Sequence, residues 1–264
     1  MQRYYTRACN FYYGNKSKFL VNKKKTLCLS GNPKISFDHI EIISRNSKKK
    51  ISEKKLNSLP KKLKKQITID LKKITSKKKN FAQLNFKKIP NIMGVLNLTP
   101  DSFSDGGKFN DKKKGIKHAF QMFKAGANII DIGGESTRPG SKTVSIKLEW
   151  KRINEILKFI SKKVPVSLDT RKAEIMKRGI KQGVKIINDV SGLNFDKESV
   201  NILRKHNTPF VIQHSKGNPE NMQNKPSYKN ELLDIYDFFE NKIKFLRSIG
   251  IKHNNIIIDP GIGF

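Results

Sequence analysis

Short apolar runs alternate with segments of helical periodicity from about residue 90 to residue 264. Each run is rich in isoleucine or valine and ends in polar residues or glycine, which is typical of a buried strand that leads into a functional loop. The six runs cover residues 92–96, 128–132, 164–168, 184–187, 210–212 and 256–258. Three intervening segments carry an apolar stripe with the period of a helix, made by Ile116, Ala119, Phe120 and Phe123, by Trp150, Ile153, Ile156, Leu157 and Ile160, and by Leu232, Leu233, Tyr236, Phe239, Ile243 and Leu246. This pattern predicts βα units and a parallel sheet.

The positions of the polar residues indicate which parallel architecture to expect. They follow every predicted strand, as in a (β/α) barrel, whereas an open doubly wound sheet concentrates its site at one switch point. No G-x-G-x-x-G or G-x-x-x-x-G-K-[ST] motif occurs, so the nucleotide-binding forms of that alternative are unsupported. A complete TIM barrel has eight βα units in about 250 residues. We therefore expect an α/β protein in which residues 90–264 form a partial TIM barrel, truncated after the sixth strand.

Two long polar loops follow the first two runs. Their sequences are NLTPDSFSDGG and GGESTRPGS. Both loops are rich in polar residues and in glycine, which core packing does not require. The later runs end at Asp169, Asn188, His214 and Asp259. A single aspartate at a strand end is more often a turn or helix cap than a ligand. Six polar ends at one edge of a sheet favour a binding site over six unrelated turns.

Five segments closely resemble successive motifs of the dihydropteroate synthase family, and they read NIMGVLNLTPDSFSDGG, ANIIDIGGESTRPGS, VPVSLDT, VKIINDVSG and IIIDPGIGF. The resemblance covers roughly residues 90–264. It implies a TIM-barrel transferase of folate biosynthesis. Such an enzyme joins p-aminobenzoate to 6-hydroxymethyl-7,8-dihydropterin pyrophosphate and releases pyrophosphate, with Mg²⁺ as cofactor. The family resemblance also implies a homodimer, and from the sequence itself we expect a cytoplasmic location.

The resemblance assigns residues to the pterin pyrophosphate. Asp169, Asn188 and Asp259 match the family's pterin contacts, and Thr137 matches its pyrophosphate contact. A pterin presents a guanidine-like edge with several N–H donors, which carboxylates accept well. Asn97 matches the asparagine linked to the metal ion. Asp169 is also expected to act catalytically, because a buried carboxylate stabilises a cation that develops on the pterin.

A second group matches the side of the site where p-aminobenzoate binds. Phe103, Arg138 and Pro139 match loop residues that close over the arene, and Thr137 and Phe264 are expected beside it. Phe103 and Arg138 are the further catalytic candidates, since the loops fix the approach of the attacking amine.

The sequence departs from the family pattern at two positions. Ser215 stands where an apolar residue usually follows the histidine, and Arg171 replaces a commonly smaller residue. By itself, His214 is more often a hydrogen-bonded histidine at a barrel mouth than a metal ligand.

The net charge is +33, from 55 basic and 22 acidic residues, which would ordinarily suggest a nucleic-acid or membrane-surface partner. The basic set is 46 Lys and only 9 Arg, however, and phosphate-binding surfaces draw heavily on the planar fork of arginine. We therefore expect small-molecule substrates and neither nucleic acid nor membrane as partner. No apolar run is long enough for a membrane span or a signal peptide, and two cysteines are too few for a disulfide framework.

Residues 1–89 are expected to form a separate basic extension. Residues 1–90 hold 25 basic and 4 acidic side chains. Residues 27–29 and 40–43 predict short strands, and the lysine-rich residues 47–79 predict a basic helix or a linker. Two alternatives to the synthase remain open at this point. One is a non-catalytic pterin-binding protein, and the other is a basic binder of nucleic acid or membrane surfaces.

Overall fold

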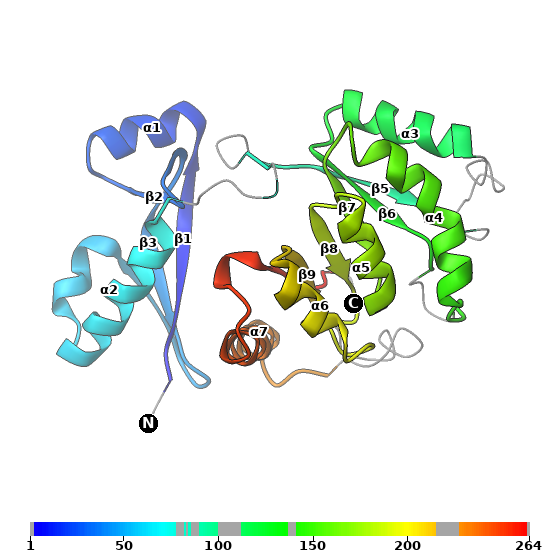
Figure 1. The fold of residues 1–264 in the computed structure, drawn as a ribbon. Coiled ribbons are helices and arrows are strands. Elements are labelled where there is room, and N and C mark those ends of the chain that lie inside the picture. The colour runs from blue at the N-terminus through cyan, green and yellow to red at the C-terminus, as the bar shows by residue number, and fades with distance from the viewer. Residues whose placement is uncertain are drawn as a thin grey trace. The chain divides into compact units, whose positions relative to one another are not determined.

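The computed structural model describes residues 3–77, 82, 84–85, 90–99, 112–136, 141–214 and 227–262. The chain divides into two compact units between Asn80 and Phe81. The boundary expected from the sequence was between residues 89 and 90. Figure 1 labels the elements of both units. Among the described residues, no helix is both long enough and apolar enough to cross a membrane.

The first unit is an antiparallel sheet with two α-helices. Its elements are β1 (Tyr5–Tyr13), α1 (Gly14–Asn22), β2 (Leu27–Leu29), β3 (Asn32–Ile43), β4 (Lys48–Ser52), a 3₁₀ helix (Glu53–Ser58) and α2 (Lys61–Thr75). Strand β3 pairs with β1 along one edge and with β2 and β4 along the other. The lysine-rich segment thus contains a strand as well as a helix, and the predicted strand at residues 40–43 is the end of a longer one.

The core of the first unit lies between β3 and α2. Ile67 and Leu71 of α2 belong to one buried cluster with Phe37, Ile40 and Ile42 of β3. These helix positions are four residues apart, which places both side chains on one face, while the lysines of α2 remain exposed or half-buried. The unit therefore has an apolar core of its own despite its high charge.

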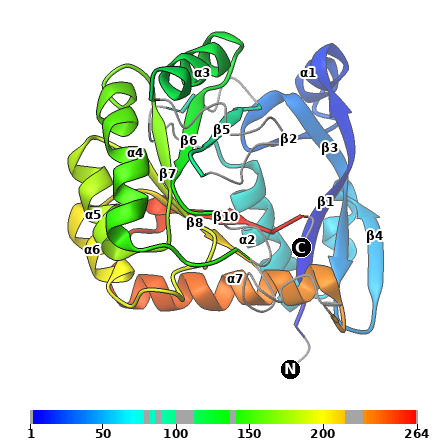
Figure 2. The same ribbon diagram turned by 90° about the vertical axis from the view of Figure 1, so that its right-hand side faces the viewer.

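The second unit is a parallel sheet with helices between its strands. Its elements are β5 (Met93–Asn97), α3 (Lys112–Lys124), β6 (Ile129–Gly133), α4 (Ile146–Ile160), β7 (Val166–Asp169), α5 (Ala173–Lys181), β8 (Ile186–Asp189), α6 (Ser199–His206), β9 (Phe210–Gln213), α7 (Glu231–Ser248), a 3₁₀ helix (His253–Asn255) and β10 (Ile256–Asp259). Its six strands are all parallel and follow chain order from β5 to β10. This confirms the predicted α/β fold and the six predicted strands. Figure 2 shows helices α3 to α7 around the outer side of these strands.

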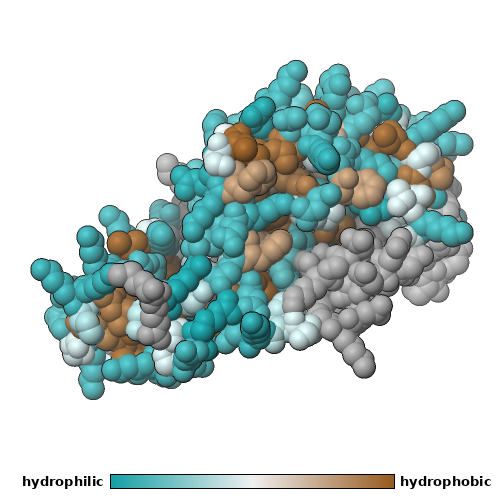
Figure 3. Space-filling view, turned by 90° about the horizontal axis from the view of Figure 1, so that it is seen from below, coloured by the Kyte–Doolittle hydropathy of each residue, from teal (hydrophilic) through white to brown (hydrophobic). Residues whose placement is uncertain are grey.

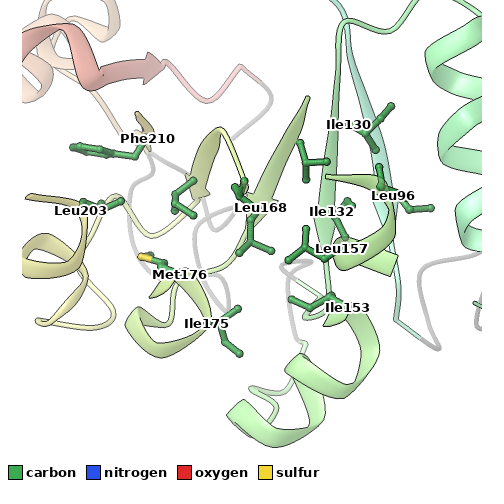
Figure 4. Packing of buried hydrophobic residues seen from close by; sticks show 14 of the residues in the cluster. Leu96, Ile130, Ile132, Ile153, Leu157, Leu168, Ile175, Met176, Leu203 and Phe210 are labelled. Atoms are coloured by element: carbon green, nitrogen blue, oxygen red, sulfur yellow. The ribbon is translucent and has the colours of Figure 1, made fainter. Parts of the chain in front are cut away.

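The main core of this unit lies between the strands and the helices. Alternate strand residues, among them Leu96, Ile132 and Leu168, pack against Ile153 of α4 and Ile175 of α5, as Figure 4 shows. Side chains along a strand point alternately to opposite faces. The other alternate residues therefore point to the face away from the helices.

The inner face of the strands is apolar near their amino-terminal ends. Ile129, Ile186 and Val211 form a separate buried cluster with Leu84 and other partly buried residues. Further along the same strands the inner positions become polar, as described below. Figure 3 shows hydrophilic side chains over much of one face, in keeping with the net charge of +33.

Candidate functional site

The carboxyl ends of four neighbouring strands bring polar side chains into one layer. Asn97 pairs in register with Gly133, Gly133 with Asp169, and Asp169 with Asn188. Residues in register on adjacent strands point to the same face of a sheet. Three of the predicted site residues therefore lie side by side on the inner face of the second unit.

Gly133 allows two of these side chains to approach each other. A Cβ atom at this position would lie 3.2 Å from Oδ1 of Asn97 and 3.3 Å from Oδ2 of Asp169. Such contacts are tighter than most side chains tolerate, so any larger residue would displace one of the two oxygens. The glycine thus creates a place where two oxygen atoms face the same small space.

Asp131 lies one layer deeper, two residues before Gly133 on the inner face of β6. Its side chain is buried, and its Oδ2 accepts a hydrogen bond of 2.9 Å from Nδ2 of Asn188. This contact fixes the orientation of the Asn188 amide, whose oxygen is then left for other donors. We did not predict Asp131 as a site residue. The available signal was a carboxylate inside an otherwise apolar strand.

Burial and like charges raise the pKa values of the inner carboxyl groups. Burial, followed by the negative charge of Asp131, raises the pKa of Asp169 well above its usual range. Burial also raises the pKa of Asp131, against the hydrogen bonds from Ser167 and Asn188. Strongly perturbed carboxyl groups of this kind concentrate at functional sites, because folding alone does not favour them.

Several buried polar atoms near this layer have no hydrogen-bond partner within the described part of the chain. They include Thr99 Oγ1 and Asp169 Oδ1. Buried polar atoms in folded proteins are nearly always paired, and each exception requires an explanation. A ligand that brings N–H donors to Asp169 would supply the missing partner.

Asp189, next to Asn188, has the structural role that single aspartates at strand ends usually have. It is fully buried and accepts hydrogen bonds from the Ser191 hydroxyl at 2.6 Å and from the backbone N–H groups of Ser191 and Leu193. Burial still raises its pKa, and these donors only partly offset that effect. Asp189 therefore caps a turn rather than facing the inner site.

Asp259 ends β10 in register with Gln213. Its Oδ1 accepts a hydrogen bond of 2.8 Å from the backbone N–H of Gly261, so one of its two oxygens holds a turn. The backbone N–H of His214 donates to the carbonyl of Asp259 at 2.8 Å. The imidazole of His214 is buried and packs edge-on against Phe238 with ring centroids 4.9 Å apart. Both residues thus lie at the same end of the sheet as Asn97 and Asp169.

Several predicted site residues lie outside the part of the chain that the structure describes. These are Phe103, Thr137, Arg138, Pro139 and Phe264, together with Ser215. Their roles remain predictions from the resemblance.

The family model described as "Pterin binding enzyme" matches residues 93–264. A dihydropteroate synthase of Synechocystis is 42% identical over 175 residues, which cover 66% of this chain and 61% of the relative. The corresponding enzyme of Clostridium beijerinckii is 43% identical over 194 residues, which cover 73% of this chain and 68% of the relative. The chain thus spans about three fifths to two thirds of the length of these relatives.

Solved structures agree with the sequence matches. The Yersinia pestis dihydropteroate synthase, in complex with a sulfonamide drug, superposes with a TM-score of 0.63 at 40% identity, covering 66% of this chain and 64% of that one. The Clostridium difficile dihydropteroate synthase, in the presence of pteroic acid, superposes with a TM-score of 0.61 at 39% identity, covering 69% of this chain and 67% of that one. The resemblance predicted from the sequence motifs is thereby confirmed, and the chain belongs to the pterin-binding enzyme family, among relatives that are dihydropteroate synthases.

Proposed function

We propose that the protein with this chain is a dihydropteroate synthase. It condenses 6-hydroxymethyl-7,8-dihydropterin pyrophosphate with p-aminobenzoate to give dihydropteroate and pyrophosphate. The observation that carries the proposal is the Asp169 carboxyl group, in one layer with Asn97 and Asn188. Its Oδ1 is buried and has no hydrogen-bond partner among the described residues, and its pKa is raised.

Two further relatives support the choice of substrates. The Xanthomonas albilineans synthase was solved with 4-aminobenzoic acid and is 33% identical, with a TM-score of 0.59. The Burkholderia cenocepacia synthase was solved with 7,8-dihydropteroate and is 32% identical, with a TM-score of 0.60. We extend these ligands to the present chain because its inner layer offers acceptors suited to a pterin.

Asp169 and Asn188 read the donor-rich edge of the pterin. The unpaired oxygen of Asp169 accepts N–H groups of the pterin ring, and the Asn188 amide, held by Asp131, accepts another. Asp259 contributes the carboxylate oxygen that its turn does not use. Each charge-assisted hydrogen bond contributes about 1.5–3 kcal/mol, so two or three offset the cost of an ionised Asp169 in a buried site.

The chemical step needs charge stabilisation more than a strong base. When the C–O bond to pyrophosphate breaks, the bonding pair leaves with the oxygen and positive charge develops on the pterin methylene. The ionised Asp169 carboxylate, whose Oδ1 is shielded from water, stabilises that charge. The aryl amine is uncharged at neutral pH, so it attacks the methylene carbon directly and then loses a proton. Phe103 and Arg138 are assigned to closing the site during this step.

Magnesium fits the donor set at the top of β5. Asn97 offers an amide oxygen beside Asp169 Oδ2, and oxygen donors are the ligands that Mg²⁺ prefers. No group of three or more His, Cys, Asp or Glu residues that could hold a metal ion occurs within the described ranges. We propose that the ion is held mainly by substrate phosphates and waters, with Asn97 as a protein contact. Bound there, magnesium would neutralise charge on the leaving pyrophosphate.

The remaining assignments rest on the family resemblance. Thr137 contacts the pyrophosphate, and Arg138, Pro139 and Phe264 lie beside p-aminobenzoate. We also propose a homodimer in the cytoplasm, with small-molecule substrates as the partners of the site.

Product formation by the purified gene product tests the function directly. With both substrates and Mg²⁺, mass spectrometry should detect dihydropteroate together with an equal amount of pyrophosphate, and omission of either substrate should abolish both. Asn188→Leu should raise the KM for the pterin ester by at least about tenfold, because one hydrogen bond to the ring is lost. Asn201→Leu, on the exposed face of α6, is the matched control and should leave this KM unchanged. Absence of product from the folded wild type would contradict the proposal.

A further inference from the structure

A buried carboxylate of α4 contacts the turn that follows Asp169. Glu149, fully buried in the first turn of α4, accepts hydrogen bonds from the Thr170 hydroxyl at 2.6 Å and from Lys172 Nζ at 2.6 Å. Thr170 and Lys172 are themselves buried. Glu149 therefore holds two of the three residues that directly follow Asp169, although no step of the proposed reaction uses it.

Lys172 keeps Glu149 in place. Its amine also donates to Oε2 of Glu135 at 2.9 Å, and Arg171 Nε donates to the same oxygen at 3.1 Å. Burial opposes ionisation of Glu135, but the hydrogen bonds from Arg171 and Lys172 outweigh it and lower its pKa. Lys172 is thus shared between two carboxylates. Removing one member of such a network leaves an uncompensated buried charge, so the arrangement resists displacement.

Gly134 brings the start of α4 close to the sheet. A Cβ atom there would lie 2.8 Å from Cγ2 of Ile153 and 2.9 Å from the carbonyl oxygen of Glu149. The carbonyl of Gly134 in turn accepts a hydrogen bond of 2.7 Å from Arg152 Nη1. The first turn of α4 therefore packs directly on the backbone that follows β6, and Glu149 is presented from a fixed position.

The Thr170 hydroxyl joins this network to the backbone of the turn. While it donates to Glu149, its oxygen accepts the backbone N–H of Lys172 at 3.3 Å. The backbone N–H of Thr170 donates to the carbonyl of Asn188 on β8 at 3.0 Å. The turn is thus tied to α4 by a side chain and to β8 by its backbone.

Asp169 depends on this turn for its position. It lies in the inner layer, whereas Thr170 contacts α4 on the helix side of the sheet. Oδ1 of Asp169 has no hydrogen-bond partner among the described residues, so none of them holds that oxygen in place. Because Asp169 and Thr170 are adjacent in the chain, a shift of the Thr170 backbone displaces the Asp169 carboxyl group as well.

We propose that Glu149 is a positioning residue for Asp169, acting through the Thr170 hydroxyl without touching the substrate. This rests on the proposed function, in which Asp169 contacts the pterin and stabilises the developing cation. Electrostatic stabilisation is effective when the charged group is already in place and needs no reorganisation during the reaction. Glu149 supplies that order from the far side of the sheet, and Lys172 supplies the counter-charge that keeps Glu149 buried.

Steady-state kinetics of two Thr170 variants test this inference. Thr170→Val keeps the shape of the side chain but removes the hydroxyl, and kcat per folded molecule should fall by at least about tenfold, since misplacing a reacting group by about 1 Å lowers rates about 100-fold. Thr170→Ser keeps the hydroxyl and loses only a methyl group, so kcat should stay within about threefold of the wild type. A kcat for Thr170→Val that equals that of the wild type, or an equally low kcat for Thr170→Ser, would overturn the inference.

Glu149→Gln breaks the same contact from the other side, and it decides the question if Thr170→Val does not fold. Because the ammonium group of Lys172 only donates, the amide oxygen of the new side chain should face Lys172, and its NH₂ group then faces the Thr170 hydroxyl. The value of kcat should fall as in Thr170→Val, and the double variant should lose no more than about threefold further. Fully additive losses would contradict action through one contact. Glu174→Gln is the matched control, since Glu174 pairs with Arg178 at 2.8 Å outside the network, and kcat should stay unchanged.

NMR supplies a readout that does not depend on activity. The ¹³Cγ resonance of Asp169 should shift in Thr170→Val and should coincide with that of the wild type in Thr170→Ser. The amide of Lys172 should also exchange at least about tenfold faster in Thr170→Val, because its hydrogen-bond acceptor is removed. If the wild type forms no dihydropteroate, the proposed function fails, and the Asp169 resonance then decides the positioning role alone. An unchanged Asp169 resonance in Thr170→Val would overturn the inference.

Discussion

The buried carboxylates of the first unit differ in their surroundings from those in the inner layer of the second unit. In the first unit, Glu41 accepts hydrogen bonds from Arg7 at 2.7 Å and from Lys48 at 2.9 Å. The bond from Lys48 lowers the pKa of Glu41, and Arg7 adds to that effect despite burial. In the inner layer of the second unit, Asp131 and Asp169 have no cation beside them among the described residues, and burial raises both pKa values.

Asp38 extends the same contrast. Burial opposes its ionisation, but hydrogen bonds with His39, Asn10 and Tyr12 lower its pKa overall. Carboxylates whose pKa is lowered by such donors contribute to stability at neutral pH, whereas buried carboxylates whose pKa is raised oppose it. A fold retains the second kind where a ligand or a reaction uses it. The inner layer of the parallel sheet, rather than the more highly charged first unit, is therefore where chemistry is expected.

Asp169→Asn should produce the largest effect on turnover. The amide keeps the shape of the carboxyl group but no longer stabilises a cation, and loss of one such electrostatic contact lowers kcat by about 10²–10³-fold. Asp196→Asn is the control, since Asp196 accepts the backbone N–H groups of Ala173 and Glu198 away from the inner layer. Initial rates with both substrates saturating measure the effect. A kcat for Asp169→Asn within threefold of the control would remove Asp169 from the chemical step.

The free energy of unfolding should depend on pH in opposite directions for the carboxylates with raised pKa values and for those with lowered pKa values. Unfolded aspartates titrate near pH 4, and the folded pKa of Asp131 is higher. The folded protein therefore keeps a proton that the unfolded chain has lost, and the free energy of unfolding falls as pH rises between those two pKa values. The contributions of Asp38 and Glu41, whose folded pKa values are lowered, are present above about pH 4 and disappear as pH falls through the folded pKa.

Asp131→Asn isolates this effect, because the amide oxygen still accepts the hydrogen bond from Asn188. Its melting temperature should exceed that of the wild type by at least about 2 °C at pH 7, and the difference should vanish near pH 4. Asp38→Asn should instead lower the melting temperature at pH 7. Circular dichroism melts between pH 4 and pH 8 provide the measurement. If the melting temperature of Asp131→Asn differed from that of the wild type by the same amount at pH 4 and at pH 8, the raised pKa of Asp131 would be contradicted.

Removal of residues 1–80 should have the smallest effect on turnover. This unit has its own core, so the rate per folded molecule should stay within about twofold of the wild type. Extending the deletion to residue 89 also removes Leu84, which packs against Ile129, Ile186 and Val211. That longer deletion should lower the melting temperature by a few degrees, because about 1–2 kcal/mol of apolar burial is lost. Differential scanning calorimetry and initial rates, measured on both deletion variants, distinguish the two expected effects. A large loss of kcat in the shorter deletion would assign the first unit to catalysis.

Strands of the second unit were predictable because their signal is local. Residues 92–96 and 256–258, for example, appear as Met93–Asn97 and Ile256–Asp259, shifted or extended by one residue. Strand β1 was not predicted, because Arg7, Cys9 and Asn10 interrupt its alternation, and Asn10 has a positive φ of 60° within the strand. Tertiary pairing with β3 makes this segment a strand.

Site residues were predictable only where they directly follow an apolar run that predicts a strand. Asn97, Asp169 and Asn188 follow apolar runs, and the parallel register brings them together. The partnership of Glu149 with Lys172 was not predictable, because it joins residues 23 apart through helix packing. The sequence also contains no signal for which buried carboxylates lack a partner, since pairing depends on the whole fold.

A titration of the aspartate carboxyl groups tests most directly whether the fold leaves the site carboxylates unpaired. Protein labelled with ¹³C at Asp Cγ can be followed by NMR from pH 3 to pH 9, with Asp→Asn variants to assign the signals. The structure predicts that Asp169 titrates well above the usual value near 3.9 and that Asp38 titrates below it. Asp169→Asn should in addition lower the pKa of Asp131, because the two negative charges repel each other. An ordinary pKa for Asp169 in the ligand-free protein would contradict the proposed distinction between the two units.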